Sequence, residues 1–133
     1  MSEFTVREAA ALLGVSDDTV RRWADAGRLA IRKSGTRQTI AGTSLVPLLA
    51  DLAAESPLAA TFPTAKASAR NRFTGIITAV TRDGVMAQVE LQAGPFRVVS
   101  LMSREAADEL GLEPGMLASA SAKATVVTIE VPE

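Results

Sequence analysis

The chain of 133 residues contains no cysteine, no histidine and no tyrosine, and its only tryptophan is Trp23. Without Cys and His, the sequence excludes disulfides, thiolate nucleophiles, imidazole general bases and nearly all zinc and copper sites. The absence of Cys is consistent with a reducing cytoplasm. Aromatic residues make up only 4% of the chain, so its core must be built from Val, Leu, Ile and Ala.

Long apolar runs are also absent. No run approaches the ~18 residues of a membrane span, and the start, Met1–Phe4, has neither the basic region nor the apolar segment of a signal peptide. We therefore expect a cytoplasmic protein that does not contact a membrane. With 47% hydrophobic residues, 22% charged residues and a net charge of −1, the chain is globular and not basic overall.

The patterning divides the chain into two parts and predicts an α+β protein with two small domains. Residues 1–54 have helical periodicity, residues 55–67 have the Pro, Ser and Ala content of a linker, and residues 68–133 have the alternation of strands. Because a β domain this short, with few aromatic residues, has only marginal stability alone, we expect it to oligomerise. The predicted strands are 73–80, 85–91, 96–101 and 125–131, with one helix over 103–110.

Helix signals in the first part predict a helix-turn-helix. Thr5 and Glu8 form a capping box, Gly14 ends the first helix and Ser16 caps a second. A hairpin tip over 34–36 and a third helix over 43–54, with Pro47 in its first turn, complete a winged arrangement. The side chains expected to pack the first two helices together are Leu12, Leu13, Val15, Val20 and Trp23.

A basic cluster lies within this winged region. Between positions 21 and 37 there are six basic residues and one acid, Asp25, which is the charge pattern of phosphate contact. A solvated helix face, or a module that serves only assembly, is the alternative, and Asp17 and Asp18 at the start of the second helix count mildly against tight phosphate contact. The candidate DNA contacts are Ser16, Thr19, Arg21, Arg22, Arg32, Lys33 and Arg37.

Four short segments carry a family resemblance. They are Phe4–Ala10 (FTVREAA), Leu13–Ser16 (LGVS), Thr19–Trp23 (TVRRW) and Gly27–Leu29 (GRL). In this register they resemble the helix-turn-helix of the MerR and excisionase superfamily. The resemblance implies a winged helix that binds DNA, usually as a dimer. The long dimerisation helix of full MerR proteins is missing, so dimerisation must come from elsewhere.

The second part has no acid–base pair, no nucleophile with a base and no metal-ligand cluster, so we expect no enzyme. Three of its segments instead each contain a small hydroxyl residue, and the first and last of them add a cation: Ser68–Arg72, Ser100–Ser103 and Ser121–Ala124. A compact dianion needs many directed N–H and O–H donors and one or two positive charges. Ordinary caps and surface charges are the alternative for each segment taken singly.

These segments resemble the molybdate-binding Mop or TOBE domain, an OB-like β-barrel found in molbindins and in molybdate-dependent regulators. Ser-Ala-Arg-Asn at 68–71, Gly75–Ile77, Ser103 to Gly115 and Lys123–Ala124 carry the match. The resemblance implies a site for molybdate or tungstate between subunits, and hence at least a dimer; single-domain molbindins also form hexamers. Where some relatives have a second hydroxyl, this chain has Ala106. The implied ligands are Ser68, Ala69, Arg70, Lys123 and Ala124 of one subunit, with Ser103 of its partner.

Two functions follow from these parts. The first is a molybdate-responsive DNA-binding transcriptional regulator, whose linker either couples the two domains or merely holds two DNA-reading heads near each other. The second is a molybdate storage or homeostasis protein whose N-terminal module serves assembly, although such an oligomer has no need of the Arg21–Arg22 pair. An accessory domain of an anion importer is a weaker third reading, because the sequence has no ATP-binding segment.

Overall fold

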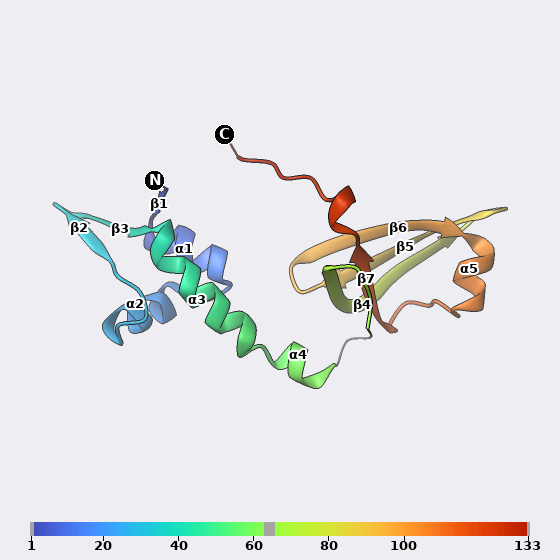
Figure 1. The fold of residues 1–133 in the computed structure, drawn as a ribbon, viewed down its shortest axis with the longest axis horizontal. Coiled ribbons are helices and arrows are strands. Elements are labelled where there is room, and N and C mark those ends of the chain that lie inside the picture. Colours follow the sequence, from blue (N-terminus) through green and yellow to red (C-terminus); the bar gives the residue numbers. More distant parts are fainter. Residues whose placement is uncertain (1, 63–65, 133) are drawn as a thin grey trace. The chain divides into compact units, whose positions relative to one another are not determined.

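The computed structural model describes residues 2–62 and 66–132, which divide into two compact units, Met1–Thr64 and Ala65–Glu133. The first unit is mainly helical with a small hairpin, and the second is a curled antiparallel sheet with one short helix (Figure 1). The predicted α+β class, with a winged helix-turn-helix followed by an OB-like sheet, is confirmed.

The first unit combines four helices with a three-stranded antiparallel sheet in the order β1-β3-β2. The hairpin β2–β3 is the predicted wing, and Gly35 at its tip has φ 64°, which favours glycine. The short β1 was not predicted; it holds the N-terminus against β3. The elements are β1 Glu3–Phe4, α1 Val6–Leu13, α2 Asp17–Asp25, β2 Arg32–Ser34, β3 Arg37–Ala41, α3 Gly42–Ala54 and α4 Pro57–Thr61.

The predicted caps of α1 and α2 are confirmed. The Thr5 amide donates to Glu8 Oε1 at 2.9 Å, and the Glu8 amide donates to Thr5 Oγ1 at 3.1 Å. The hydrogen bond from the Thr5 amide, followed by the one with its hydroxyl, lowers the pKa of Glu8, and the charge of Arg37 acts in the same direction. Because the folded-state pKa is depressed, this cap stabilises α1 at neutral pH and loses its contribution as the pH falls through that pKa. Ser16 Oγ accepts from the Thr19 amide at 3.2 Å and starts α2.

The core of the first unit lies between α1, α2, α3 and the hairpin. The prediction that Leu12 packs α1 against α2 is wrong, because Leu12 is 58% exposed. The inward stripe of α1 is set by Val6, Ala9 and Ala10, and Leu12 lies outside this spacing of three and four residues. The buried core residues are Val6, Ala9, Ala10, Val20, Leu29, Ile40, Leu45 and Leu48, with Leu13, Val15 and Trp23 packed against them.

Two expectations for residues 43–67 are corrected. Helix α3 begins at Gly42, so Pro47 lies in its second turn rather than its first. Part of the predicted linker is helical: Pro57 at an N-terminal position starts α4, which ends at Thr61. Residues 63–65 of that linker lie outside the described residues.

The second unit is one four-stranded antiparallel sheet in the order β6-β5-β4-β7. A bulge in β4 between Ile77 and Ala79 increases its curl, as expected of half a barrel. The Ser103 cap starts α5, as predicted, and its Oγ accepts from the Ala106 amide at 3.1 Å. The elements are β4 Asn71–Arg82, β5 Met86–Ala93, β6 Phe96–Ser103, α5 Arg104–Glu109 and β7 Leu117–Ala122.

The predicted last strand over 125–131 is wrong. The strand that pairs with β4 is β7, Leu117–Ala122, and the chain then makes a 3-10 turn over Ala124–Val126. The sequence of β7, LASASA, was missed because Ala and Ser have low strand propensity. Residues 127–132 have the composition of a strand but pair with none of the described residues, and Ile129 and Val131 are among the most exposed apolar side chains.

Gly75 lies where the backbone of β5 passes close to β4. A Cβ at this position would clash with the Gln92 carbonyl oxygen and would lie 2.9 Å from the Ala93 Cα, both of them backbone atoms that cannot turn aside. We expect Gly75→Ala to lower the free energy of unfolding of the sheet unit by about 3 kcal/mol or more, measured by urea denaturation followed by circular dichroism. Gly84→Ala is the matched control because its Cβ meets open space; equal stability of the two variants would contradict the argument.

No helix among the described residues is long and apolar enough to cross a membrane.

Candidate functional site

Two of the three predicted oxyanion-binding segments meet at one end of the sheet. Strand β4 begins at Asn71 and β7 ends at Ala122, and these two residues are partners in the antiparallel register. The residues immediately beyond them are Arg70 and Lys123, so Ser68–Arg70 and Lys123–Ala124 leave the sheet side by side. The register therefore brings Arg70 and Lys123 to the same end of the sheet, and Ser68, Ala69 and Ala124 adjoin them in the chain.

Two cations at this end, Arg70 and Lys123, are not neutralised within the described part of the chain. Arg70 and Lys123 form no ion pair with any described acid, and Arg70 Nη1 lies 3.5 Å from the Ala67 carbonyl oxygen. At the other end of the sheet, Arg82 and Arg104 both pair with Asp108. Two adjacent unneutralised cations repel each other, and an anion bound between them would remove that repulsion.

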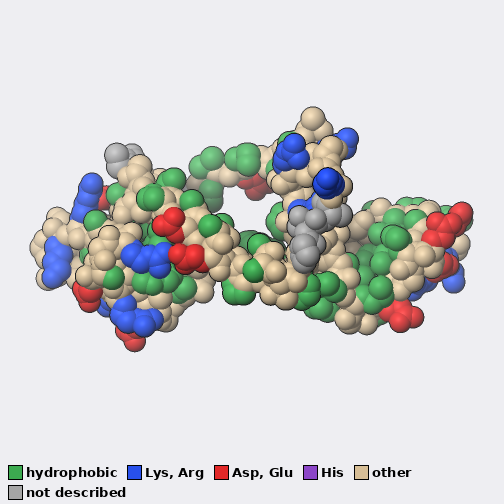
Figure 2. All heavy atoms as spheres, turned by 60° about the horizontal axis from the view of Figure 1, so that its bottom comes forward, with side chains coloured by type: hydrophobic (Ala, Val, Ile, Leu, Met, Phe, Trp, Pro, Cys, Tyr) green, Lys and Arg blue, Asp and Glu red, His purple; other side chains and the backbone are tan. Residues whose placement is uncertain are grey.

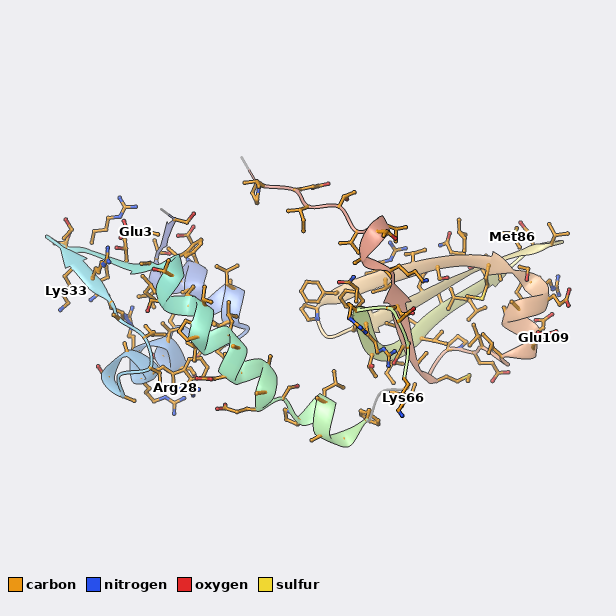
Figure 3. All side chains as sticks on the ribbon, in the orientation of Figure 1. Glu3, Arg28, Lys33, Lys66, Met86 and Glu109 are labelled. Atoms are coloured by element: carbon orange, nitrogen blue, oxygen red, sulfur yellow. The ribbon has the colours of Figure 1, made fainter. Side chains whose placement is uncertain are left out.

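Ser103 lies at the opposite end of the sheet. It pairs with Met86, beside the end of β4 where Arg82 pairs with Ala87. Strand β4 is 12 residues long, so roughly 35 Å of extended chain separates its two ends. Figure 3 shows Lys66 at one end of this unit and Met86 and Glu109 at the other. One chain therefore does not bring Ser103 to Arg70 and Lys123.

The segment around Ser103 is held firmly. The Arg104 amide donates to the Val85 carbonyl at 2.8 Å, Arg104 Nη1 donates to the Asp83 carbonyl at 2.9 Å, and Arg82 Nε donates to Asp108 Oδ1 at 2.8 Å. The Ser103 hydroxyl accepts a hydrogen bond from α5, which leaves its own proton available to a ligand. Acidic side chains gather at this end (Figure 2), and Arg82 and Arg104 are already paired with Asp108, so an anion there would need cations from elsewhere.

All of the predicted ligands lie at the surface, and only Ala69 is half-buried. The second unit also has a cavity of about 270 Å³ on its sheet, but none of the predicted ligands lines it. Its lining is mainly apolar and includes Ile77, Leu91 and Leu112. Charges exposed to water are strongly screened. Tight anion binding at the β4–β7 end therefore needs a further surface that excludes water.

In the first unit, the predicted DNA contacts on α2 are tied together. Ser16 Oγ lies 3.0 Å from Thr19 Oγ1, which accepts from Arg22 Nη2 at 3.0 Å. Arg21 Nη1 donates to Gln38 Oε1 of β3 at 3.3 Å, which links the helix to the wing. These side chains are exposed or half-buried, so they are accessible to a ligand.

The wing and α2 border an open groove of about 680 Å³. Arg21 and Lys33 contribute positive charge to its lining, and Asp25 contributes the opposite charge. Figure 3 shows Lys33 on the projecting hairpin. Arg32 lies 3.6 Å from Glu3 Oε1, so part of its charge is compensated. The structure thus brings Arg21, Lys33 and their neighbours to one face, with Arg32 the weakest candidate contact.

Arg28, part of the basic cluster in the sequence, has a structural role. Its guanidinium lies 5.3 Å from the centre of the Trp23 ring, and its Nη2 lies 3.5 Å from Glu55 Oε1. A cation over an indole face and an ion pair both stabilise the fold. Arg28 therefore joins the end of α2 to the end of α3 instead of adding to the DNA-facing charge.

Two polar residues were not assigned a role from the sequence. Gln38 holds Arg21, and Asn71 Nδ2 donates to the Ala122 carbonyl at 3.2 Å. The first contact joins α2 to β3 and the second joins β4 to β7, so only the tertiary structure could have pointed to them. Within the described ranges there is no cluster of three or more acidic, His or Cys residues that could hold a metal ion.

Comparison with protein-family models assigns both parts. Residues 67–129 match the TOBE domain, and residues 3–48 match a helix-turn-helix domain. No curated protein matches the chain.

Solved structures are similar to the second half. MopII from Clostridium pasteurianum is 33% identical, with 50% of this chain and 100% of that chain covered and a TM-score of 0.47. A molybdate-binding protein from Sporomusa ovata is 24% identical, with 50% and 100% covered and a TM-score of 0.48. The cytoplasmic molybdate-binding protein ModG, in a form with molybdate bound, is 39% identical, with 45% of this chain and 43% of that chain covered and a TM-score of 0.43.

Proposed function

Because residues 67–129 form a TOBE domain and residues 3–48 form a helix-turn-helix domain, we propose that this protein is a cytoplasmic molybdate-responsive transcriptional regulator. The observation that carries the proposal is the pair of cations Arg70 and Lys123 on adjacent strand ends, which form no ion pair with any acid that the structure describes. The ligand is a tetrahedral oxyanion, molybdate or tungstate. MopII and the other similar proteins, which include proteins described as molybdate-binding, support this ligand class.

In this proposal the anion lies between two copies of the chain. One copy supplies the side chains of Ser68, Arg70 and Lys123 and the amides of Ala69 and Ala124. The second copy supplies Ser103, which lies at the wrong end of its own sheet to serve its own site. A second copy would also exclude water from the exposed cations, which strengthens their attraction for a dianion. The protein would then be at least a dimer, with a hexamer as the larger alternative.

The helix-turn-helix domain would read DNA in the manner of the MerR and excisionase type. Helix α2 would enter the major groove with Ser16, Thr19, Arg21 and Arg22, while Lys33, Arg37 and Arg32 on the wing would contact flanking phosphates. A dimer would bind two half-sites. Molybdate can regulate this binding only by as much as it favours one arrangement of the two copies.

The first test is isothermal titration of the full chain with molybdate, with sulfate as the control and light scattering to measure mass. We expect binding of molybdate but not of sulfate, in a dimer or larger species, because the spacing of a fixed set of donors selects for the size of the anion. Binding of neither anion would contradict the sensor role. The protein would then be interpreted as a DNA-binding protein whose sheet unit serves only to form the oligomer.

The storage alternative makes a different prediction for DNA. Selection of duplexes from a random pool should yield a repeated sequence if the protein is a regulator, and the affinity should fall steeply with salt. A protein that binds molybdate but selects no sequence would be a storage protein whose first unit serves assembly. The groove beside α2, to which Arg21 and Lys33 contribute positive charge, favours the regulator.

A further inference from the structure

We infer that Asn71 is a positioning residue that holds the two halves of the oxyanion site together before the ligand arrives. This inference rests on the proposed function for the ligand, although the contact itself does not. Asn71 Nδ2 donates to the carbonyl of Ala122, its own cross-strand partner, at 3.2 Å, and the Asn71 side chain is half-buried. Arg70 immediately precedes Asn71 in the chain, and Lys123 immediately follows its partner Ala122.

This hydrogen bond lies at the last pair of the β4–β7 ladder, where it can limit fraying of the strand ends. The β4–β7 ladder ends at Asn71 and Ala122, and neither 66–70 nor 123–126 belongs to a strand. The last pair of a ladder is where strands fray, because only one side has a neighbouring pair. A side-chain donor on this last carbonyl fixes the point from which Lys123 and Ala124 depart.

The electrostatics of this end give such a clamp a role. Arg70 and Lys123 are like charges on adjacent strand ends, with no ion pair to a described acid. Their repulsion, although screened by water, favours separation of the two ends when no anion is bound. The amide of Asn71 opposes this separation without adding a charge that would compete for the cations or repel the ligand. An aspartate of the same shape could not donate to the Ala122 carbonyl and would repel a dianion.

The residues that follow Ala122 are held by a second constraint, the 3-10 turn over Ala124–Val126. The 3-10 turn begins at once, with the Val126 amide donating to the Lys123 carbonyl at 3.0 Å. The directions of the Lys123 side chain and the Ala124 amide are therefore set by two neighbouring constraints, the turn on one side and Asn71 on the other. Loss of Asn71 leaves the turn intact but releases it from β4.

The test compares Asn71→Ala with Thr74→Val. Thr74 Oγ1 lies 2.7 Å from Ser119 Oγ, so Thr74→Val also removes one hydrogen bond between β4 and β7, three residues further from the end. We expect both variants to lower sheet stability similarly. Only Asn71→Ala should weaken molybdate binding, by about tenfold, as when the competent arrangement falls to roughly a tenth of the population. Equal molybdate affinity in Asn71→Ala and the parent, or equal loss in both variants, would overturn the inference.

Stopped-flow kinetics separate positioning from direct contact. If Asn71 only prepares the site, Asn71→Ala should slow molybdate association and leave the dissociation rate unchanged, because the bound states are alike. A faster dissociation with unchanged association would mean that Asn71 touches the ligand, which would overturn a purely positioning role.

Amide hydrogen exchange in the protein without ligand tests the clamp independently of molybdate. We expect faster exchange in the last pairs of the β4–β7 ladder, Asn71–Phe73 with Ala120–Ala122, in Asn71→Ala than in Thr74→Val or the parent. Unchanged exchange would overturn the inference whether or not the protein binds molybdate. If exchange is faster in Asn71→Ala but the parent binds no molybdate, the clamp is supported and the proposed ligand is contradicted.

Discussion

Replacing Lys123 or Arg70 with alanine is expected to weaken molybdate binding by about 10- to 100-fold each, the loss typical of a hydrogen bond to a charged group. A bound dianion would lose one of two counter-charges, and the exposed position of both side chains means that the fold should tolerate the change. Isothermal titration would measure the affinity, and thermal unfolding would show that the sheet unit remains folded.

Arg97→Ala is the matched control for these variants. Arg97 is also an exposed cation of the sheet unit, but it forms an ion pair with Glu90 on the neighbouring strand. Its removal changes the net charge by the same amount without touching the β4–β7 end. If Lys123→Ala and Arg70→Ala bound molybdate as tightly as Arg97→Ala does, the anion site would have to be sought elsewhere.

The second large effect concerns DNA. The double variant Arg21→Ala, Arg22→Ala should lower the affinity for the duplex selected by the parent protein by about 100-fold or more, because each lost base or phosphate contact costs about 1–3 kcal/mol. Where both arginines contact phosphates, the slope of log affinity against log salt should fall by about 2. Fluorescence anisotropy over a series of salt concentrations would measure both quantities.

This double variant should bind molybdate as the parent does, since both arginines belong to the first unit. Arg7→Ala combined with Arg97→Ala is the charge-matched control, because it removes two cations from surfaces that are not assigned to DNA. Unchanged DNA affinity in the arginine variant, or an equal loss in the control, would remove α2 as the recognition helix.

Local signals were sufficient to predict the helical caps. The Thr5–Glu8 box, the Ser16 cap and the Ser103 cap each depend on residues within three positions of one another, and all three form as predicted. Ser16 and Ser103 are therefore each committed to a backbone amide whatever else they bind. Local chemistry of this kind can be read from a sequence because no distant residue competes with it.

Pairing across the sheet could not be predicted in the same way. A strand propensity was visible at 125–131, yet β7 forms from Leu117–Ala122, because a position beside β4 matters more than intrinsic preference. Leu12 shows the same limit for helices, since an apolar residue is buried only where its face meets another element. The relation between Asn71 and Ala122, and with it the meeting of Arg70 and Lys123, becomes visible only once the register is known.

The family resemblance indicated the six candidate ligands, but chain geometry determines how they can be used. Arg70 and Lys123 meet on one strand pair, whereas Ser103 lies at the far end of the sheet. A complete site of this composition would therefore need two copies. The resemblance also implies this requirement, and strand lengths and register lead to it independently.

Trp23, held beneath the Arg28 guanidinium, gives the molecule an intrinsic optical reporter. Because the chain has no tyrosine and no other tryptophan, ultraviolet emission comes essentially from this one ring in the helix-turn-helix unit. Molybdate added to the unlabelled protein binds, in our proposal, to the other unit. A shift in emission on titration would therefore report that the occupied sheet unit has altered the surroundings of α2, and a silent titration with normal heat release would mean that the two units respond separately.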